Sequence, residues 1–205
     1  MNVLFFSYRG AWGSGGTFSF THALEDVASA IHFVRADSSV QAFGIDPRRV
    51  ILAGHSMGGW LALMGAAADS SIACTIALDF WNVGDDGRRM RSDRQLDSTR
   101  IAYSKWVTAP GGPLQVDSGR SLVAEMKTNA DLWNPERSAP RLSSRSILLL
   151  STTTNESHAS LVTALHSAHA RQVTALQWPT DHSFSDRRIR LARTIVGWLK
   201  QQCGT

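Results

Sequence analysis

The stretch from residue 49 to residue 68, RVILAGHSMGGWLALMGAAA, decides how the rest of the sequence is interpreted. It begins with apolar, β-branched residues typical of a buried strand and ends with residues that favour a helix. Between them, Gly54, Ser56 and Gly58 form a G-x-S-x-G pattern. In a strand-turn-helix context, this pattern predicts a tight elbow that exposes the Ser56 hydroxyl as a nucleophile.

Other segments around this elbow indicate an α/β fold. Apolar runs predict strands at residues 3–7, 49–53, 73–79, 146–151 and 173–178, and periodic apolar positions predict helices at 24–34 and 185–200. Alternating strands and helices favour a mostly parallel sheet of about five strands with helices on both faces. Residues 82–144 break the alternation, and we expect them to form a cap or lid inserted into one domain of residues 1–205.

Composition excludes several classes of protein. With 205 residues, 43% of them hydrophobic, the chain can bury a core without metals or disulfides. Cys74 and Cys203 are far apart, and we expect one buried thiol and one thiol in the tail. The net charge of +4 comes partly from basic clusters at 88–94 and 186–193, which lack the interleaved aromatics that nucleic-acid binding requires. No secretory leader or membrane span is evident, so we expect a soluble cytoplasmic protein that binds neither nucleic acid nor membrane.

A nucleophilic serine needs a base, and His182 is the best-placed histidine. It lies in the segment PTDHSFSD (179–186), between the last predicted strand and the last helix. The carboxyl ends of parallel strands meet at one edge of a sheet, so His182 and Ser56 are expected at the same edge. His55 lies inside the elbow and is expected to support the turn.

Three segments together resemble the α/β-hydrolase superfamily, nearest to its esterase and peptidase-like members. They are VLFFSYRGAWGSGG (3–16), IDPRRVILAGHSMGG (45–59) and TDHSFSDRRIRLARTIVGWL (180–199). The resemblance covers essentially the whole chain and implies an α/β-hydrolase fold, a Ser–acid–His triad, hydrolysis through an acyl-enzyme, and no metal or organic cofactor. By position, it implies Ser56 as nucleophile, His182 as general base and the backbone N–H of Met57 as an oxyanion donor.

The acid of the triad departs from the family pattern. The family usually places an aspartate shortly after the strand at 146–151, where this chain has Asn155 followed by Glu156. An amide cannot balance the charge of an imidazolium, so Glu156 is the first candidate and Asp79, at the end of the preceding strand, is the second. We expect Asp181 to point away from the imidazole and Asp186 to cap the last helix.

The segment at 3–16 departs from the pattern as well. In the family it follows the fourth strand, so three earlier strands, and the loop that supplies the second oxyanion N–H, have no counterpart ahead of it. Residues Gly10 to Gly13 are the candidate replacement for that loop. The first strand is expected to pair directly with 49–53, or else a partner chain covers the open edge of the sheet in a homodimer.

The predicted function is therefore that of a serine hydrolase that cleaves carboxylic esters of small acyl groups entering under the cap. Trp81, Trp106 and Trp133 are candidates to line an acyl pocket, although packing explains each of them equally well. The alternatives are a peptidase or amidase of the same fold, and a non-catalytic, truncated hydrolase-fold protein.

Overall fold

The computed structural model describes residues 1–204, which divide into two compact units. Residues 34–81 and 135–204 form the first, here called the sheet unit, and residues 2–33 and 82–134 form the second, the helical unit. Within residues 1–204, no helix is both long and apolar enough to cross a membrane.

The sheet unit contains a parallel sheet in the order β1-β2-β3-β4. Its strands are β1 (Ile51–His55), β2 (Cys74–Leu78), β3 (Ser146–Thr152) and β4 (Gln172–Trp178). The predicted α/β fold class is confirmed, and these four strands lie where the sequence predicts them.

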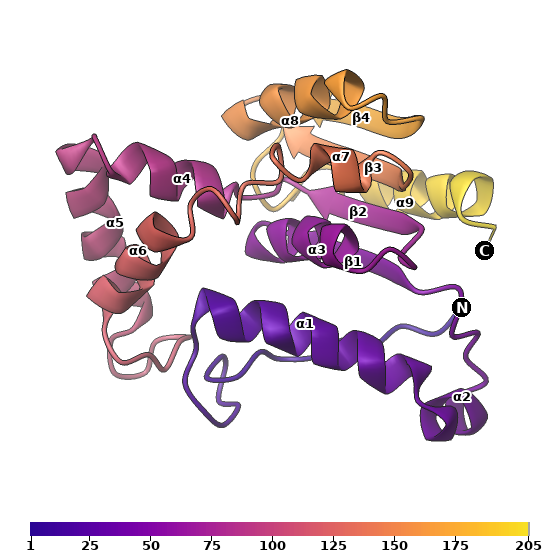
Figure 1. Cartoon of the computed structure of the whole chain (residues 1–205), viewed down its shortest axis with the longest axis horizontal. Helices are drawn as coiled ribbons and strands as arrows, with labels where there is room; N and C mark the ends of the chain where they lie inside the picture. Colours follow the sequence, from indigo (N-terminus) through magenta and orange to yellow (C-terminus); the bar gives the residue numbers. More distant parts are fainter. Residues whose placement is uncertain (205) are drawn as a thin grey trace. The chain divides into compact units, whose positions relative to one another are not determined.

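Helices cover both faces of this sheet (Figure 1). They are α3 (Met57–Ala68), α7 (Ala139–Leu142), α8 (Glu156–Ser167) and α9 (Arg188–Gln202), and the short helix α2 (Asp37–Phe43) belongs to the same unit. Because side chains alternate along a strand, Ile76 and Leu148 face one side, where they are buried against Trp198 of α9. On the other side, Ser151 of β3 contacts His158 of α8.

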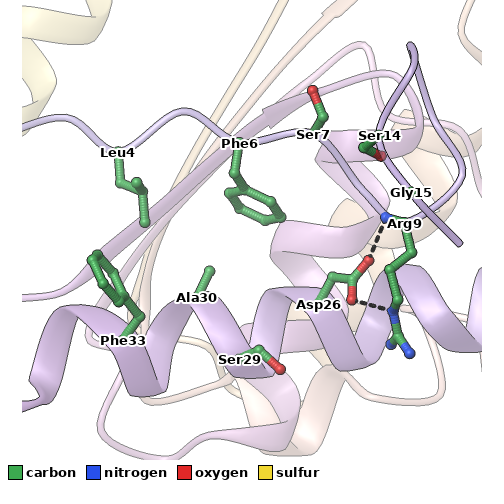
Figure 2. Close-up of a pocket in the computed structure, with 10 residues that line it drawn as sticks. All are labelled: Leu4, Phe6, Ser7, Arg9, Ser14, Gly15, Asp26, Ser29, Ala30 and Phe33. Carbon is green, nitrogen blue, oxygen red and sulfur yellow. Dashed lines mark hydrogen bonds and ion pairs between the residues drawn. The ribbon is translucent and has the colours of Figure 1, made fainter.

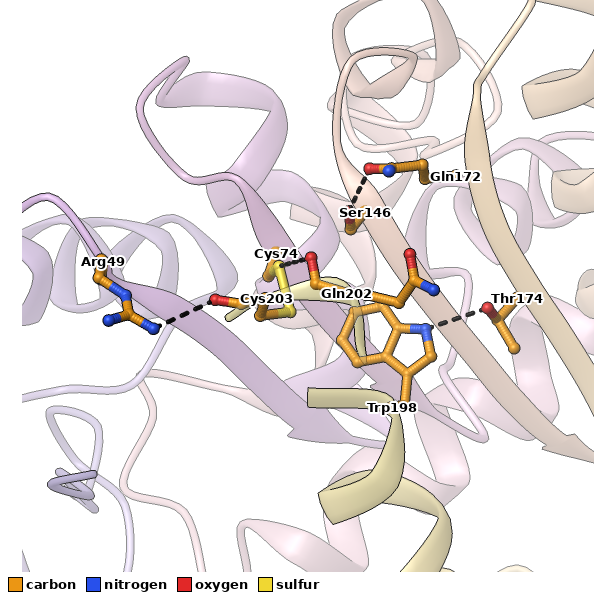
Figure 3. Close-up of a disulfide and its surroundings, with 8 residues drawn as sticks. All are labelled: Arg49, Cys74, Ser146, Gln172, Thr174, Trp198, Gln202 and Cys203. Atoms are coloured by element: carbon orange, nitrogen blue, oxygen red, sulfur yellow. Dashed lines mark hydrogen bonds between the residues drawn. A yellow bond between two sulfur atoms is a disulfide. The ribbon is translucent and has the colours of Figure 1, made fainter. Parts of the chain in front are cut away.

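A disulfide joins Cys74, at the start of β2, to Cys203, just beyond α9 (Figure 3). The two Cα atoms lie 6.1 Å apart although 129 positions separate the residues in the chain. The expectation of two separate thiols is wrong, because the packing of α9 on the sheet returns the end of the chain to β2. Disulfides persist chiefly in oxidising compartments, so this bond does not favour the cytoplasmic location, which stays a prediction.

Replacing Cys203 with serine is expected to lower the free energy of unfolding by about 2–5 kcal/mol, because the cross-link restricts the unfolded chain. Urea denaturation of the variant and of the oxidised wild type measures the difference. Wild type treated with a reductant is the control and should unfold like the variant. Equal midpoints for variant and oxidised wild type would show that the bond adds no stability.

The helical unit contains most of α1 (Phe20–Arg35) together with α4 (Val83–Met90), α5 (Arg94–Val107) and α6 (Gly119–Thr128). The carboxylate of Glu125 on α6 accepts hydrogen bonds of 2.9 Å from the backbone N–H groups of Phe20 and Thr21, which start α1. This contact satisfies N–H groups that a helix cannot bond internally. The helices α4, α5 and α6 lie within residues 82–144, whose role as a cap stays a prediction.

The predicted first strand at residues 3–7 does not form. Val3 and Phe5, expected to be buried, are 81% and 93% exposed. Leu4 and Phe6 point toward α1 and, with it, line a pocket of about 360 Å³ (Figure 2). Residues 3–7 make no backbone hydrogen bond with the rest of residues 1–204, and a strand without a neighbour is not stable in water.

Strand β1 is accordingly an edge strand, since within residues 1–204 its only paired neighbour is β2. The expected direct pairing of the first segment with residues 49–53 is wrong. An open edge presents unpaired N–H and C=O groups, so the homodimer that covers it stays a prediction, to be measured by light scattering.

Candidate active site

Ser56 lies at the turn between β1 and α3 in a strained backbone conformation. Its φ of 56° and ψ of −120° fall in a region that residues with side chains rarely adopt. Glycine is required beside it, because a Cβ on Gly54 would lie 2.0 Å from the carbonyl oxygen of Gly58. The G-x-S-x-G pattern therefore forms the tight elbow predicted from the sequence.

The backbone of Ser56 is fixed to the end of the neighbouring strand. Its N–H donates to the carbonyl of Leu78 at 2.9 Å, and its carbonyl accepts from the N–H of Trp81 at 3.1 Å. These bonds hold the elbow at the carboxyl ends of β1 and β2, where open parallel sheets bind their ligands. Within residues 1–204, the Ser56 hydroxyl makes no hydrogen bond of its own.

His182 contacts Asp79 at this edge of the sheet. His182 lies in the loop between β4 and α9, and Asp79 directly follows β2 with a φ of 40°. The distance from His182 Nδ1 to Asp79 Oδ2 is 2.5 Å, and the proton is on Nδ1 because an ionised carboxylate can only accept. This bond sets the tautomer of His182 and leaves Nε2 as the nitrogen that can accept a proton.

The carboxylate of Asp79 is buried and has several partners. Its Oδ1 accepts from the Thr152 N–H at 2.9 Å, from the Thr152 hydroxyl at 3.1 Å and from Asn155 Nδ2 at 3.0 Å. Burial alone raises the pKa of Asp79, but hydrogen bonds from His182, Thr152 and Asn155 outweigh it and bring the pKa below its ordinary value. Asp79 is therefore ionised at neutral pH.

Glu156, the first candidate for the triad acid, is not the carboxylate that contacts His182. It is the first residue of α8, and the carboxylate hydrogen-bonded to His182 is that of Asp79, the second candidate. The sequence favours Glu156 because it follows β3 as the family's aspartate usually does. The structure instead brings the end of β2 to the imidazole, which no local pattern encodes.

His55 supports the loop of His182 in addition to the turn. Its Nε2–H donates to the backbone carbonyl of His182 at 2.7 Å, and the two imidazole rings lie 4.5 Å apart between centroids. Burial lowers the pKa of His55, and the bond to the carbonyl raises it in part. A neutral His55 thus connects the elbow to the loop that presents the candidate base.

The remaining carboxylates near His182 have structural partners. Asp181 accepts a 2.9 Å bond from the N–H of Ser185, in agreement with the expectation that it points elsewhere. Asp186 accepts from the hydroxyl of Thr180 and does not cap α9, because the N-cap residue is Arg187 without a side-chain bond. The expected cap by Asp186 is wrong.

Met57 is the first residue of α3, so its N–H has no partner one turn earlier in the helix. An N–H in this position, with the positive end of the helix dipole, favours an oxyanion next to Ser56. The position is the one that the sequence predicts for the first oxyanion donor.

The glycine-rich segment proposed for the second oxyanion donor is largely engaged within the helical unit. The N–H groups of Gly10, Ala11 and Trp12 donate bonds of 3.0, 3.0 and 2.8 Å. Their acceptors are the backbone oxygens of Gly15, Tyr8 and Pro113, respectively. These three groups are therefore unsuited to bind an oxyanion, which corrects the expectation for this part of Gly10 to Gly13.

The tryptophans considered for an acyl pocket differ in environment. Within the helical unit, Trp133 is only 3% exposed and packs against the ring of Phe20, whereas Trp106 on α5 is 67% exposed. Trp81 follows β2 in the sheet unit and is half-buried. Trp133 is thus a core residue of its own unit.

Two further residues of the site were not predicted as functional. In the sequence, Asn155 is an amide in the place of the family's aspartate, and Thr152 belongs to no motif. Both act through contacts with a distant residue, Asp79, which a local pattern does not reveal. Within residues 1–204, no group of three or more His, Cys, Asp or Glu side chains is arranged to hold a metal ion.

Comparison with known structures gives the same fold. A puromycin-hydrolyzing peptidase from Mycobacterium tuberculosis aligns with a TM-score of 0.60 and 17% identity, over 96% of this chain and 26% of the peptidase. An alpha-beta hydrolase from Vibrio vulnificus aligns with 0.59 and 24%, over 94% and 61%. An esterase from Pyrococcus furiosus aligns with 0.57 and 14%, over 95% and 68%. At these identities the likeness shows the fold alone, and the chain spans only part of each structure.

Comparison with known sequences identifies the family. No curated protein sequence matches the chain significantly. A model described as the alpha/beta hydrolase family, however, matches residues 2–194, a range that includes the elbow, Asp79 and His182. Because this match extends over most of a chain that also has the parallel sheet and the strained serine turn, the protein belongs to the alpha/beta hydrolase family.

Proposed function

We propose that this hydrolase-family protein is a serine hydrolase that cleaves carboxylic esters through an acyl-enzyme on Ser56. The main observation in support is the 2.5 Å contact between His182 and Asp79 at the strand ends that also position the Ser56 elbow. In the proposal, the triad acid is Asp79, the second of the two candidates, and not Glu156.

In the proposed first half-reaction, Ser56 Oγ attacks the ester carbonyl carbon while His182 Nε2 accepts the hydroxyl proton. Asp79 holds the imidazole in the required tautomer and stabilises the imidazolium that forms. The N–H of Met57 stabilises the negative charge on the carbonyl oxygen. His182 then returns the proton to the leaving alcohol as the C–O bond breaks.

In the second half-reaction, water attacks the acyl-enzyme and His182 again accepts and then returns a proton, which releases the acid and restores Ser56. The mechanism requires a hydrogen bond between the Ser56 hydroxyl and His182 Nε2. Such contacts are often loose without substrate and tighten in the Michaelis complex. These steps need no metal or organic cofactor.

The same triad cleaves esters and amides, but the alcohol released from an ester is a better leaving group than the amine released from an amide. For this reason we propose an ester substrate.

A fluorophosphonate probe tests the nucleophile: Ser56 in the folded protein is expected to be labelled. Turnover of p-nitrophenyl acetate and octanoate, compared with an aminoacyl anilide, then separates an esterase from a peptidase. A folded protein that the probe does not label would be a non-catalytic member of the family.

A further inference from the structure

Asn155 joins three parts of the candidate site through one side chain. Its Nδ2 donates to Asp79 Oδ1 and to the backbone carbonyl of Phe80, both at 3.0 Å. Its Oδ1 accepts from the N–H of Ser157 at 3.1 Å, and Asn155 is thereby the N-cap of α8. Every hydrogen-bonding atom of the amide thus has a partner.

The two bonds from Nδ2 restrain Asp79 in a specific orientation. One fixes Oδ1, which leaves Oδ2 directed at His182, and the other fixes the backbone carbonyl of Phe80, the residue after Asp79. Asp79 has a φ of 40°, a conformation that persists only where surrounding contacts enforce it. Thr152 bonds the same oxygen, Oδ1, so among the described residues, 1–204, His182 is the hydrogen-bond partner of Oδ2.

We propose that Asn155 is a positioning residue for the triad acid: its amide orients the carboxylate of Asp79 toward His182, and a carboxylate in its place could not. The proposal rests on the proposed function for its kinetic consequence. It differs from a simple helix-capping role, because the cap uses Oδ1 whereas the orientation of Asp79 uses Nδ2.

The charges around Asp79 predict in which direction a carboxylate at position 155 would shift the pKa of Asp79. His182 is hydrogen-bonded to Asp79, and two further histidines, His55 at the elbow and His158 on α8, interact electrostatically with it. Within residues 1–204, the hydrogen-bond partners of Asp79 are His182, Thr152 and Asn155, and no carboxylate is among them. A second carboxylate 3 Å from Asp79 would disfavour ionisation of the pair and remove a hydrogen bond to the charged form, and both effects raise the pKa of Asp79.

The variant N155D separates the two roles. Aspartate caps a helix as well as asparagine does, so the start of α8 is retained, but the donor to Asp79 is lost and a negative charge is added. We expect kcat for p-nitrophenyl acetate at pH 7 to fall by about 10- to 100-fold with little change in KM. We also expect the acidic limb of the pH–rate profile to move up by about one unit or more.

Two further variants complete the test. E156Q changes a charge in the same turn of α8 without touching Asp79 and should retain wild-type kcat and pH dependence. N155S also keeps a capping oxygen but lacks the amide. It should therefore have the thermal midpoint of the wild type and a lower kcat. If N155D has wild-type kcat and an unshifted pH–rate profile, Asn155 is only a cap and the proposal is wrong. Should N155D fail to fold, the same result for N155S leads to the same conclusion.

One readout does not depend on turnover. The proton on His182 Nδ1, in a short charge-assisted bond to Asp79, should give a downfield NMR resonance in the wild type. This resonance should shift or broaden in N155D and N155S and stay unchanged in E156Q. A wild type that hydrolyses no ester would overturn the proposed function, whereas an unchanged resonance in the Asn155 variants would overturn the role of Asn155.

Discussion

Replacing Asp79 with asparagine is expected to lower kcat for p-nitrophenyl acetate by a factor on the order of 10⁴ at neutral pH, the loss known for the acid of a serine triad. Asparagine has the same shape and its oxygen can still accept a bond from Nδ1–H. It cannot balance the imidazolium charge, and its NH₂ group stabilises the wrong tautomer of His182. Initial rates over a range of ester concentrations measure kcat and KM for the variant and the wild type.

The matched control is E156Q, which removes the carboxylate that the sequence favoured first. It is expected to keep the wild-type kcat, because the acid that contacts His182 is Asp79. Near-wild-type rates in D79N would contradict the assignment of Asp79, and a large loss in E156Q with none in D79N would return the role to Glu156.

Since the pKa of Asp79 lies below its ordinary value, wild-type activity should not decline through protonation of Asp79 until the pH is well below neutral.

Replacing Ser56 with alanine is expected to have the largest effect, a loss in kcat of about 10⁶, because the acyl-enzyme can no longer form. Binding and oxyanion stabilisation remain, so the residual rate should stay above that of water and KM should change little. Fluorophosphonate labelling should disappear completely. Mass spectrometry of the labelled protein and the ester assay together measure both outcomes.

The exposed Ser160 of α8 provides a matched serine-to-alanine control, S160A, which should retain labelling and turnover. Circular dichroism and the thermal midpoint establish that S56A is folded. If folded S56A is still labelled, or still hydrolyses esters at wild-type rates, the nucleophile is a different residue and the proposed mechanism is wrong.

The elbow was predictable because its cause is local. A strand, a turn without room for side chains and a helix follow one another within residues 49–68, and the contact between Gly54 and Gly58 spans only four positions. The strands β2, β3 and β4 were predictable for a similar reason, since continuous apolar runs are typical of strands buried on both faces. His182 followed from its place between the last strand and the last helix.

The triad acid was not predictable in the same way. Asp79 and His182 are 103 positions apart, and the preference between Asp79 and Glu156 depends on the orientation of loops after two different strands. The disulfide and the amide contacts of Asn155 likewise join distant segments. Each is a consequence of packing that a pattern along the chain does not record.

The apolar run at residues 3–7 shows the opposite limit. Its composition is that of a buried strand, yet Val3 and Phe5 are exposed and the segment has no strand neighbour within residues 1–204. Strand formation requires hydrogen bonds to a second strand, so propensity alone cannot produce it.

The sequence by itself determined the parallel sheet, the strained serine turn and the position of His182, because short-range sterics and buried apolar runs encode them. Only the tertiary structure decided which carboxylate meets His182, which cysteines are joined and whether the first strand forms, because each of these depends on contacts between segments far apart in the chain.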